Sequence, residues 1–356
     1  MVNDICFENF RGFKKLNLQE LQQVTLISGK NNAGKSSILE GIFLAMDHSA
    51  PDSFIKINGF RGLPLAYDVN CLWEPLFYEL NTLKQMFIKM KIKGEASVLE
   101  YKRDDSFVPS NAAGASDDVF TQFLNSAKAN YSLKFNFEKG NYKESGHFVV
   151  SSSGVLRNVN TNIEGNQLQS LMVTHYINAA TMNNAIVLAE WFGKLELEGK
   201  KRQIIDILRI IDSSISDISA IVLRGQIQLY AKMGEKLLPL RLAGDGINKL
   251  LFLVLTIVEN PNSLVLIDEI ETGFHYSMYS NLWEVIATAA RENNCQIIAT
   301  THSYECIDGA VEGVKAACMD NRFCYFRVER SAEGNAAFRY DGKLLRTALD
   351  SNMEVR

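Results

Sequence analysis

The distribution of apolar residues along the chain follows two different rules. Near the start, and again in the second half, short uninterrupted apolar runs alternate with stretches that have the apolar spacing of helices. Buried strands that alternate with helices are typical of a mainly parallel sheet covered on both faces, so we predict an α/β fold. The predicted strands are residues 24–28, 264–267 and 296–301, and the predicted helices are residues 37–44, 245–259 and 280–291.

The middle of the chain has the period of one-sided antiparallel strands instead. Residues 86–94 and 131–138 alternate strictly between apolar and polar side chains, with a small, polar loop expected at 109–118. Residues 189–213 then have helical spacing. We therefore expect a β-rich extension that ends in a helical arm, inserted between two halves of the α/β domain.

This pattern predicts three consecutive segments. Residues 1–46 form an N-terminal lobe that opens with a strand, a turn and a strand; residues 47–235 form the insertion; residues 236–356 form a C-terminal lobe. The final stretch from residue 338 onward predicts a last strand and a closing helix. A chain of 356 residues is long enough for one large domain with a sizeable insertion.

Composition excludes several classes of protein. The net charge of −4 gives no global basic field of the kind that drives non-specific nucleic-acid binding. The six cysteines, Cys71 among them, have no C-x-x-C spacing and the five histidines are dispersed, so we expect reduced thiols and no zinc site. No signal-peptide pattern and no window of eighteen apolar residues is present. We therefore expect a soluble, cytoplasmic protein without membrane contact.

A phosphate-binding motif follows the first buried strand. Residues 29–36, Gly-Lys-Asn-Asn-Ala-Gly-Lys-Ser, fit the pattern G-x-x-x-x-G-K-[ST] in the required context between a strand and a helix. The glycines let backbone N–H groups point at a phosphate, Lys35 reaches the β/γ oxygens, and Ser36 offers its hydroxyl to Mg²⁺. The motif assigns nucleotide binding to Asn31, Asn32, Ala33, Gly34, Lys35, Ser36 and Ser37.

Two acids end the apolar strand at 264–267. A buried carboxylate is costly unless it meets a cation, so we expect Asp268 to hold Mg²⁺ together with Ser36 and the nucleotide. Glu269 comes next and is expected to polarise the attacking water of ATP hydrolysis. The alternative for both residues is a purely structural role.

His302 follows the strand at 296–301, at the edge of the sheet where ligands of open α/β sheets bind. We expect it to contact the γ-phosphate, although a lone histidine is more often structural. His48, His147 and His175 have no partner pattern and are expected to be structural.

Gly244, Asp245 and Gly246 stand at the predicted start of the helix 245–259. Two glycines at a helix start expose backbone N–H groups and a positive dipole end to an anion, and Lys249 can add charge. The alternative is an ordinary helix start capped by Asp245.

These motifs together resemble those of a known superfamily. Asn9-Phe10-Arg11-Gly12-Phe13 matches the opening of the ABC-type ATPases related to Rad50, SMC, RecF and OLD proteins, and residues 239–248, 267–276 and 296–306 are similar to AAA15/OLD-like ATPases of bacteria. The resemblance implies an ABC-type phosphate-loop fold with a mixed, mainly parallel sheet, and ATP with Mg²⁺ as ligands.

The resemblance also implies a partner protomer. It makes residues 244–246 the counterpart of the "L-S-G-G-Q" segment that acts from the opposite subunit, although serine and glutamine are missing here. Residues 271–275 correspond to the D-loop, which touches the partner, and 73–77 is the place that best fits a Q-loop. We therefore expect a homo-oligomer with composite ATP sites.

OLD proteins carry a C-terminal Toprim nuclease, for which the stretch after His302 is too short. The sequence thus resembles stand-alone ATPases that act as sensor or scaffold subunits of bacterial phage-defence systems, with a separately encoded effector such as a Toprim-like nuclease or a toxin. The chain has no sustained heptads, so we expect no long coiled coil like that of Rad50.

One alternative function is a DNA-clamping repair ATPase, which would bind DNA through Lys84, Lys89, Lys91 and Lys93. Otherwise these lysines form the solvated face of a strand. A transporter ATPase is disfavoured by the degenerate signature.

Overall fold

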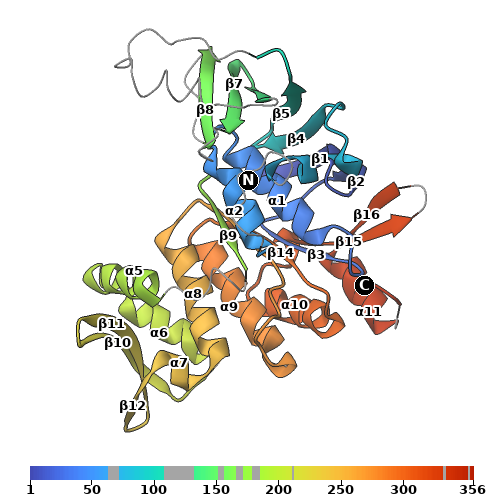
Figure 1. Ribbon diagram of the computed structural model, residues 1–356. Coiled ribbons are helices and arrows are strands. Elements are labelled where there is room, and N and C mark those ends of the chain that lie inside the picture. The colour runs from blue at the N-terminus through green and yellow to red at the C-terminus, as the bar shows by residue number, and fades with distance from the viewer. Residues whose placement is uncertain are drawn as a thin grey trace. The chain divides into compact units, whose positions relative to one another are not determined.

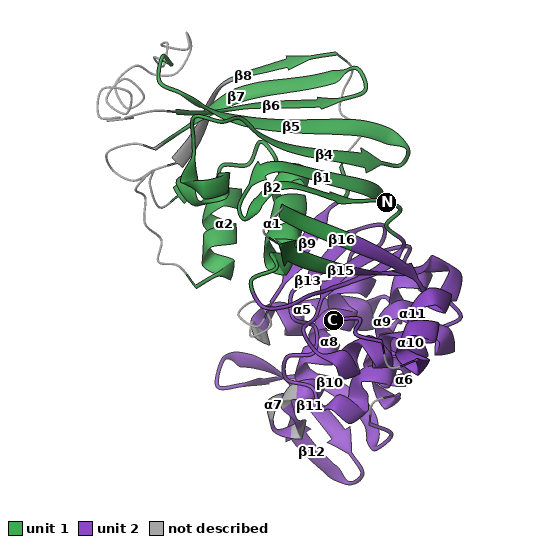
Figure 2. Cartoon of the chain, turned by 90° about the vertical axis from the view of Figure 1, so that its right-hand side faces the viewer, with its two compact units in different colours: residues 1–21, 32–172, 328–337 green, residues 22–31, 173–327, 338–356 purple. Residues whose placement is uncertain are grey.

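The computed structural model describes residues 1–62, 72–107, 132–150, 156–165, 171–178, 185–210, 212–331, 334–351 and 353–356. The chain forms two compact units that interleave along the sequence (Figure 2). Unit 1 comprises Met1–Leu21, Asn32–Met172 and Val328–Ala337; unit 2 comprises Gln22–Asn31, Val173–Arg327 and Phe338–Arg356. The first 46 residues thus contribute to both units, so the division differs from the three consecutive segments 1–46, 47–235 and 236–356. The polar loop expected at 109–118 and Cys71 lie outside the described residues.

Unit 1 is built on a seven-stranded antiparallel sheet with the order β2-β1-β4-β5-β6-β7-β8. Its strands are β1 (Val2–Phe10), β2 (Phe13–Leu18), β4 (Met86–Ile92), β5 (Glu95–Asp104), β6 (Ser132–Lys139), β7 (Tyr142–Val150) and β8 (Leu156–Glu164). The N-terminal hairpin joins the strands of the insertion because β1 pairs with β4, with Phe7 opposite Ile88. Alternating apolar residues on both strands bury one face of this sheet.

Two helices complete the described core of unit 1, α1 (Lys35–Met46) and α2 (Asp52–Phe60). Phe54 of α2 packs edge-on against Tyr101 of β5 and Phe148 of β7, with ring centroids 5.7 and 5.0 Å apart. Such aromatic packing buries large apolar areas and accounts for the strict alternation of the middle strands.

A six-stranded sheet has the order β16-β15-β3-β14-β13-β9, and its pairs from β15 to β9 are parallel. It belongs to unit 2 except for the end of β15 from Val328 and the start of β16 up to Ala337, which are assigned to unit 1. Its strands are β3 (Val24–Ser28), β9 (Thr174–Ile177), β13 (Leu264–Ile267), β14 (Gln296–Thr300), β15 (Phe323–Ser331) and β16 (Gly334–Asp341). Every residue of β3, β13 and β14 is buried, as expected for the central strands of a sheet covered on both faces.

Helices cover this sheet (Figure 1). They are α8 (Asp245–Glu259), α9 (Tyr279–Glu292), α10 (Tyr304–Ala316) and α11 (Gly342–Asp350). The largest buried side chain among them is Trp283 of α9, whose indole N–H donates to the sulfur of Cys306 on α10 over 3.5 Å. The predicted α/β fold is confirmed by this architecture.

The segment expected to be one helical arm differs from the prediction. It forms two helices, α5 (Ala185–Leu197) and α6 (Lys201–Arg209), separated at Gly199, whose φ of 75° ends the first helix. A three-stranded antiparallel sheet then follows, with β10 (Ile215–Leu223), β11 (Gln226–Met233) and β12 (Lys236–Pro239), and a short helix α7 (Leu240–Ala243). Both helices and the small sheet belong to unit 2. None of the described helices is long and apolar enough to cross a membrane.

Candidate nucleotide-binding site

Three neighbouring strands of unit 2 end at the same edge of the sheet. In the parallel ladder Ile27 of β3 lies opposite Thr300 of β14, and Ala299 lies opposite Ile267 of β13. The chain therefore leaves β3 toward Gly29, β13 toward Asp268 and β14 toward His302 at one edge. The carboxyl edge of a parallel sheet is where open α/β folds bind their ligands.

The glycine-rich loop has the backbone that its sequence predicts. Asn32 and Gly34 have φ values of 69° and 95°, and α1 begins directly afterwards at Lys35. A side chain at Gly34 would collide with the ring of Phe13, which packs under the loop. Glycine is therefore required here both for the positive φ and for the close approach.

The position of the loop in the structure is suited to binding an anion. It turns directly into the N-terminus of a 12-residue helix, where backbone N–H groups and the helix dipole favour negative charge. Lys30, Asn31 and Asn32 are exposed, Ala33 is buried, and Gly34 to Ser36 are partly exposed.

A buried ion cluster lies one turn into α1. The Glu40 carboxylate, 1% exposed, is 2.6 Å from Nε of Arg61 and 3.1 Å from Nε of Arg11. Arg61 also donates from Nη2 to the hydroxyl of Ser37 over 3.1 Å. Ser37, predicted to bind nucleotide, is thus held by an arginine beyond α2. The sequence analysis did not single out Glu40 or Arg61, since a charged residue inside a helix gives no sign of burial.

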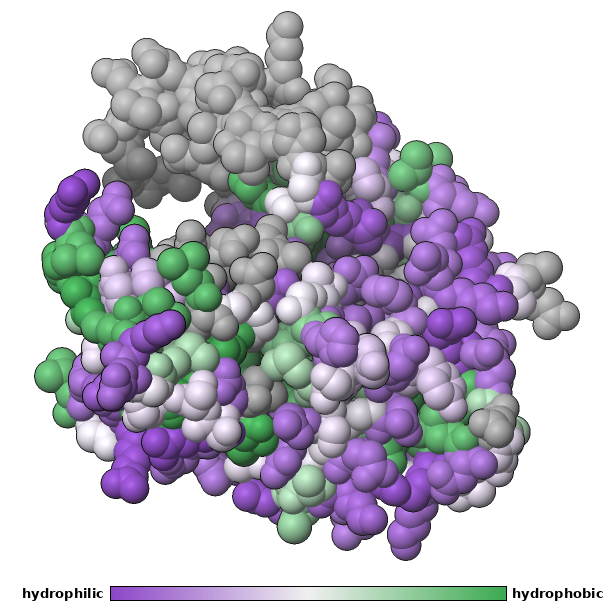
Figure 3. All heavy atoms as spheres, turned by 90° about the horizontal axis from the view of Figure 1, so that it is seen from below, coloured by the Kyte–Doolittle hydropathy of each residue, from purple (hydrophilic) through white to green (hydrophobic). Residues whose placement is uncertain are grey.

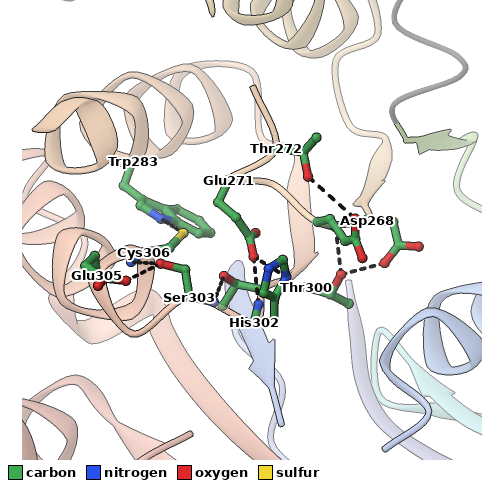
Figure 4. A network of polar contacts seen from close by, with 11 residues as sticks. Asp268, Glu271, Thr272, Trp283, Thr300, His302, Ser303, Glu305 and Cys306 are labelled. Atoms are coloured by element: carbon green, nitrogen blue, oxygen red, sulfur yellow. Dashed lines mark hydrogen bonds and ion pairs between the residues drawn. The ribbon is translucent and has the colours of Figure 1, made fainter. Parts of the chain in front are cut away.

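Asp268 has two hydroxyl partners in the structure. Thr300 donates to Oδ1 over 2.6 Å (Figure 4), and Tyr176 of β9 donates to Oδ2 over 3.2 Å. Donors on both oxygens hold the carboxylate in one orientation, and carboxylate oxygens are ligands that suit Mg²⁺. The described residues hold no cluster of three or more metal-ligating side chains, so a metal here would depend on the nucleotide for ligands.

Glu269 adopts a left-handed backbone conformation with φ of 49°, and its side chain is exposed. Its N–H donates to the Thr300 hydroxyl over 2.9 Å, while that hydroxyl donates to Asp268. Thr300 therefore holds both acids in place. A positive φ at a non-glycine residue is costly and is found most often where function requires it.

His302 contacts a buried acid, Glu271, which the sequence analysis placed in the segment 271–275 expected to touch a partner protomer and did not pair with His302. Its Nδ1 lies 2.8 Å from Oε1 of Glu271, and its backbone N–H donates to the same oxygen over 2.7 Å (Figure 4). The one feature of the sequence that could have indicated this contact is Glu271 itself, the third acidic residue in Asp-Glu-Ile-Glu.

The segment around Gly244 begins α8 as predicted. Gly244 precedes the helix with φ of 130° and is exposed, and Asp245 is the first helical residue, so Gly244 takes the capping position expected for Asp245. Lys249 was expected to add positive charge for an anion at this helix start. In the structure its ammonium group instead donates to the carbonyl oxygen of Thr272 over 3.0 Å. A side chain at Gly273, with φ of 85°, would collide with Lys249.

The two histidines of unit 1 expected to be structural each lie beside an acid. His48 lies 2.8 Å from the Glu144 carboxylate, and His147 lies 3.2 Å from Asp104. Of the four lysines considered for DNA contact, Lys89 is paired with Glu8 over 3.0 Å.

Unit 2 also has an apolar surface away from the strand ends. A cavity of about 480 Å³ has Ile186, Leu229 and Leu240 in its wall. Hydrophobic residues gather on the left of the face seen from below in Figure 3, the side on which Figure 1 places α5 and β10–β12.

Comparisons with known proteins agree with this geometry. Residues 121–308 match the family described as "AAA domain, putative AbiEii toxin, Type IV TA system", and residues 1–144 match "AAA ATPase domain". An ATP/GTP phosphatase of Helicobacter pylori (strain ATCC 700392 / 26695) is 26% identical over 341 residues, which cover 86% of this chain and 87% of that protein.

Two solved structures show the same fold. An SMC head bound to the C-winged helix domain of ScpA has a TM-score of 0.54 at 13% identity and covers 98% of this chain and 99% of its own. An SMC head with an extended coiled coil, bound to the C-terminal domain of ScpA derived from Pyrococcus furiosus, has a TM-score of 0.53 at 10% identity and covers 99% of both chains.

The loop before α1 and these relatives define the class of protein, an ATPase with an AAA domain and the fold of the SMC heads. Within it, the chain belongs to the AAA domain family described as putative AbiEii toxin of a type IV toxin–antitoxin system, whose match spans more than half of its length.

Proposed function

We propose that this ATPase is the sensor or scaffold subunit of a bacterial antiphage complex and that ATP turnover controls a separately encoded effector, a Toprim-like nuclease or a toxin. The main observation in support of ATP hydrolysis is that β3, β14 and β13 end at the same edge of the sheet. The phosphate loop, the two acids and the histidine each follow one of these strand ends. The defence role is supported by the description of the chain's family, which names a putative toxin.

In this proposal the phosphate loop binds ATP. Backbone N–H groups of residues 31–37 surround the β-phosphate, and Lys35 neutralises the β/γ oxygens. Ser36 and Asp268 would hold Mg²⁺, which supplies charge neutralisation and orients the phosphates when bound. The hydrogen bonds from Thr300 and Tyr176 hold the Asp268 carboxylate in a fixed orientation.

Glu269 orients and polarises the attacking water in this scheme, and His302 contacts the γ-phosphate. The exposure of the Glu269 side chain and its fixed left-handed backbone support the first role. A base held in one orientation gains most from positioning, because phosphoryl transfer leaves the protein little other chemistry to perform.

We further propose that hydrolysis requires a second protomer, whose Gly244, Asp245 and Gly246 close the site. The exposure of Gly244 at the start of a 15-residue helix supports this assignment. The hydrogen bond from Lys249 to Thr272 fixes the helix start against the segment expected to touch the partner.

The test couples ATP state to effector binding. The chain with Glu269→Gln, expected to trap ATP, is expressed with its flanking genes and purified with ATP and Mg²⁺; the chain with Lys35→Ala is the matched control. We expect one product of the flanking genes to co-purify with the first and not with the second, and cells with the Lys35→Ala locus to lose protection against phage. If neither difference is seen, the sensor role is wrong.

The alternative DNA-clamping function would give a different result. It predicts an affinity for duplex DNA that falls steeply with salt concentration. Because Lys89 is paired with Glu8, the strand face considered for DNA carries less free positive charge than the sequence indicates.

A further inference from the structure

Glu271 and His302 form a contact between a buried acid and a half-exposed histidine at the candidate site, and no motif predicts this pairing. Glu271 lies four residues after the end of β13 and is 5% exposed, whereas the side chain of His302 is 52% exposed. One carboxylate oxygen, Oε1, receives both the backbone N–H of His302 and its ring Nδ1. Two contacts to one oxygen hold the ring in a single orientation.

This arrangement decides which ring nitrogen carries hydrogen. A carboxylate accepts hydrogen bonds only, so Nδ1 must be protonated to contact Oε1 at 2.8 Å. In a neutral ring, Nε2 then has a lone pair and cannot donate to a phosphate oxygen. The doubly protonated ring can donate from Nε2 while Nδ1 stays on Glu271.

The surroundings of Glu271 leave His302 as its main polar partner. Within the described part of the chain, His302 is the one basic side chain that forms an ion pair with Glu271, and Oε2 is buried without a hydrogen bond. The other titratable groups that face Glu271 are Tyr279 and Cys306, which are neutral: burial raises the pKa of Tyr279, and it raises that of Cys306 to about 12. The two contacts from His302 therefore satisfy a carboxylate that would be costly to bury without them.

We propose that Glu271 is a positioning residue that fixes the orientation of His302 and the hydrogen on its Nδ1, so that Nε2 is the ring nitrogen presented to the terminal phosphate of ATP. The inference rests on the proposed role of His302 at the γ-phosphate. Glu271 itself touches no reacting atom in this scheme.

The first test is spectroscopic and does not depend on ATP. The protein is labelled with ¹⁵N-histidine, and the His302 ring signals are assigned by their loss in His302→Gln. We expect hydrogen on Nδ1 in the wild type, and a change to the Nε2-protonated form, which free imidazole side chains prefer in water, in Glu271→Leu. Glu305→Gln, which alters an exposed acid that accepts a hydrogen bond from Ser303, is the control and should change nothing.

A neutral wild-type ring protonated on Nε2 would overturn the proposal, whether or not Glu271→Leu folds. An unchanged ring in a folded Glu271→Leu protein would do the same. A failure of ATP binding in the wild type would instead refute the proposed function and leave this spectrum intact.

The second test is kinetic. Glu271→Gln keeps the shape of the side chain and removes its charge, and we expect kcat to fall on the order of 10-fold with little change in KM, the scale of losing a partner that orients a functional histidine. Combined with His302→Gln, the same change should cost less than about twofold more, because Glu271 acts through His302. Losses that multiply in the double variant would show an independent role and refute the proposal.

Discussion

The ammonium nitrogen of Lys249 lies 3.0 Å from the carbonyl oxygen of Thr272, and this contact ties the first turns of α8 to the turn that follows the two acids. Gly273 makes the contact possible, since any side chain there would occupy the position of the lysine. Two segments expected to face a partner protomer are therefore joined within one chain.

We predict that Lys249→Met weakens assembly without affecting ATP binding by the single protomer. Loss of one hydrogen bond from a charged donor costs about 1.5–3 kcal/mol, so the dimer dissociation constant should rise on the order of 10-fold or more. Sedimentation of the Glu269→Gln protein with ATP measures this constant. Lys232→Met, at an exposed position of β11, is the control, and an equal effect of both variants would contradict the prediction.

We predict that Lys35→Ala removes tight ATP binding while the fold survives. The lysine is expected to contribute a charge-assisted contact to the phosphates of about 1.5–3 kcal/mol, which corresponds to roughly 10- to 150-fold in affinity. The loop itself is held by Gly34 against Phe13 and should still form. Titration with ATP and thermal unfolding together check both statements; unchanged affinity would refute the assignment of the loop.

Glu269→Gln should retain ATP and slow its hydrolysis on the order of 10²-fold or more, the scale of losing a positioned base. Phosphate release under saturating ATP gives the rate, and a filter assay gives the bound nucleotide. Normal turnover in this variant would remove Glu269 from the mechanism.

The shared site can be tested by mixing two inactive variants. Gly246→Arg places a long side chain beside Phe274, which already lies 3.3 Å from the position of a Cβ at residue 246, and should leave ATP binding intact while abolishing hydrolysis. Mixed with Lys35→Ala, it should regain part of the activity, because one site then combines an intact loop with an intact glycine segment. Full activity of a strictly monomeric preparation, with no gain in the mixture, would rule out the shared site.

His147 should make the stability of unit 1 depend on pH. Burial lowers the pKa of His147 below its ordinary value, an effect that Asp104 opposes and that Lys134 and Lys102 increase. Below about pH 6.5 the unfolded chain therefore binds more protons than the folded one, and the free energy of unfolding falls as the pH drops. Urea denaturation at pH 7.5 and pH 5.5 should show a smaller loss for His147→Gln than for the wild type; equal losses would contradict the prediction.

The sequence predicted the central elements well for a physical reason. β13 and α8 match their predicted bounds because uninterrupted apolar runs leave little choice of period. The small sheet β10–β12 was not predicted, since its strands are largely exposed and only Ile215, Ile218, Leu229 and Ala231 give it a buried face. Patterns of burial cannot reveal strands that are scarcely buried.

The same limit applies to the candidate site. Asp268, Glu269 and His302 were predicted because they follow apolar strands directly. Tyr176 and Arg61 contact site residues only through pairings distant in sequence, so their roles depend on the fold itself.

The position of β3 in its sheet has a consequence for how the chain acquires its structure. β3 is complete by residue 28, yet both of its neighbours come late: β14 begins at Gln296 and β15 at Phe323. During synthesis, this wholly buried strand therefore has no native sheet partner until β14, far along the chain, has been made. Pairing at such separation is slow and leaves apolar edges exposed, so we expect the newly made chain to be prone to aggregation until β14 and β15 are in place.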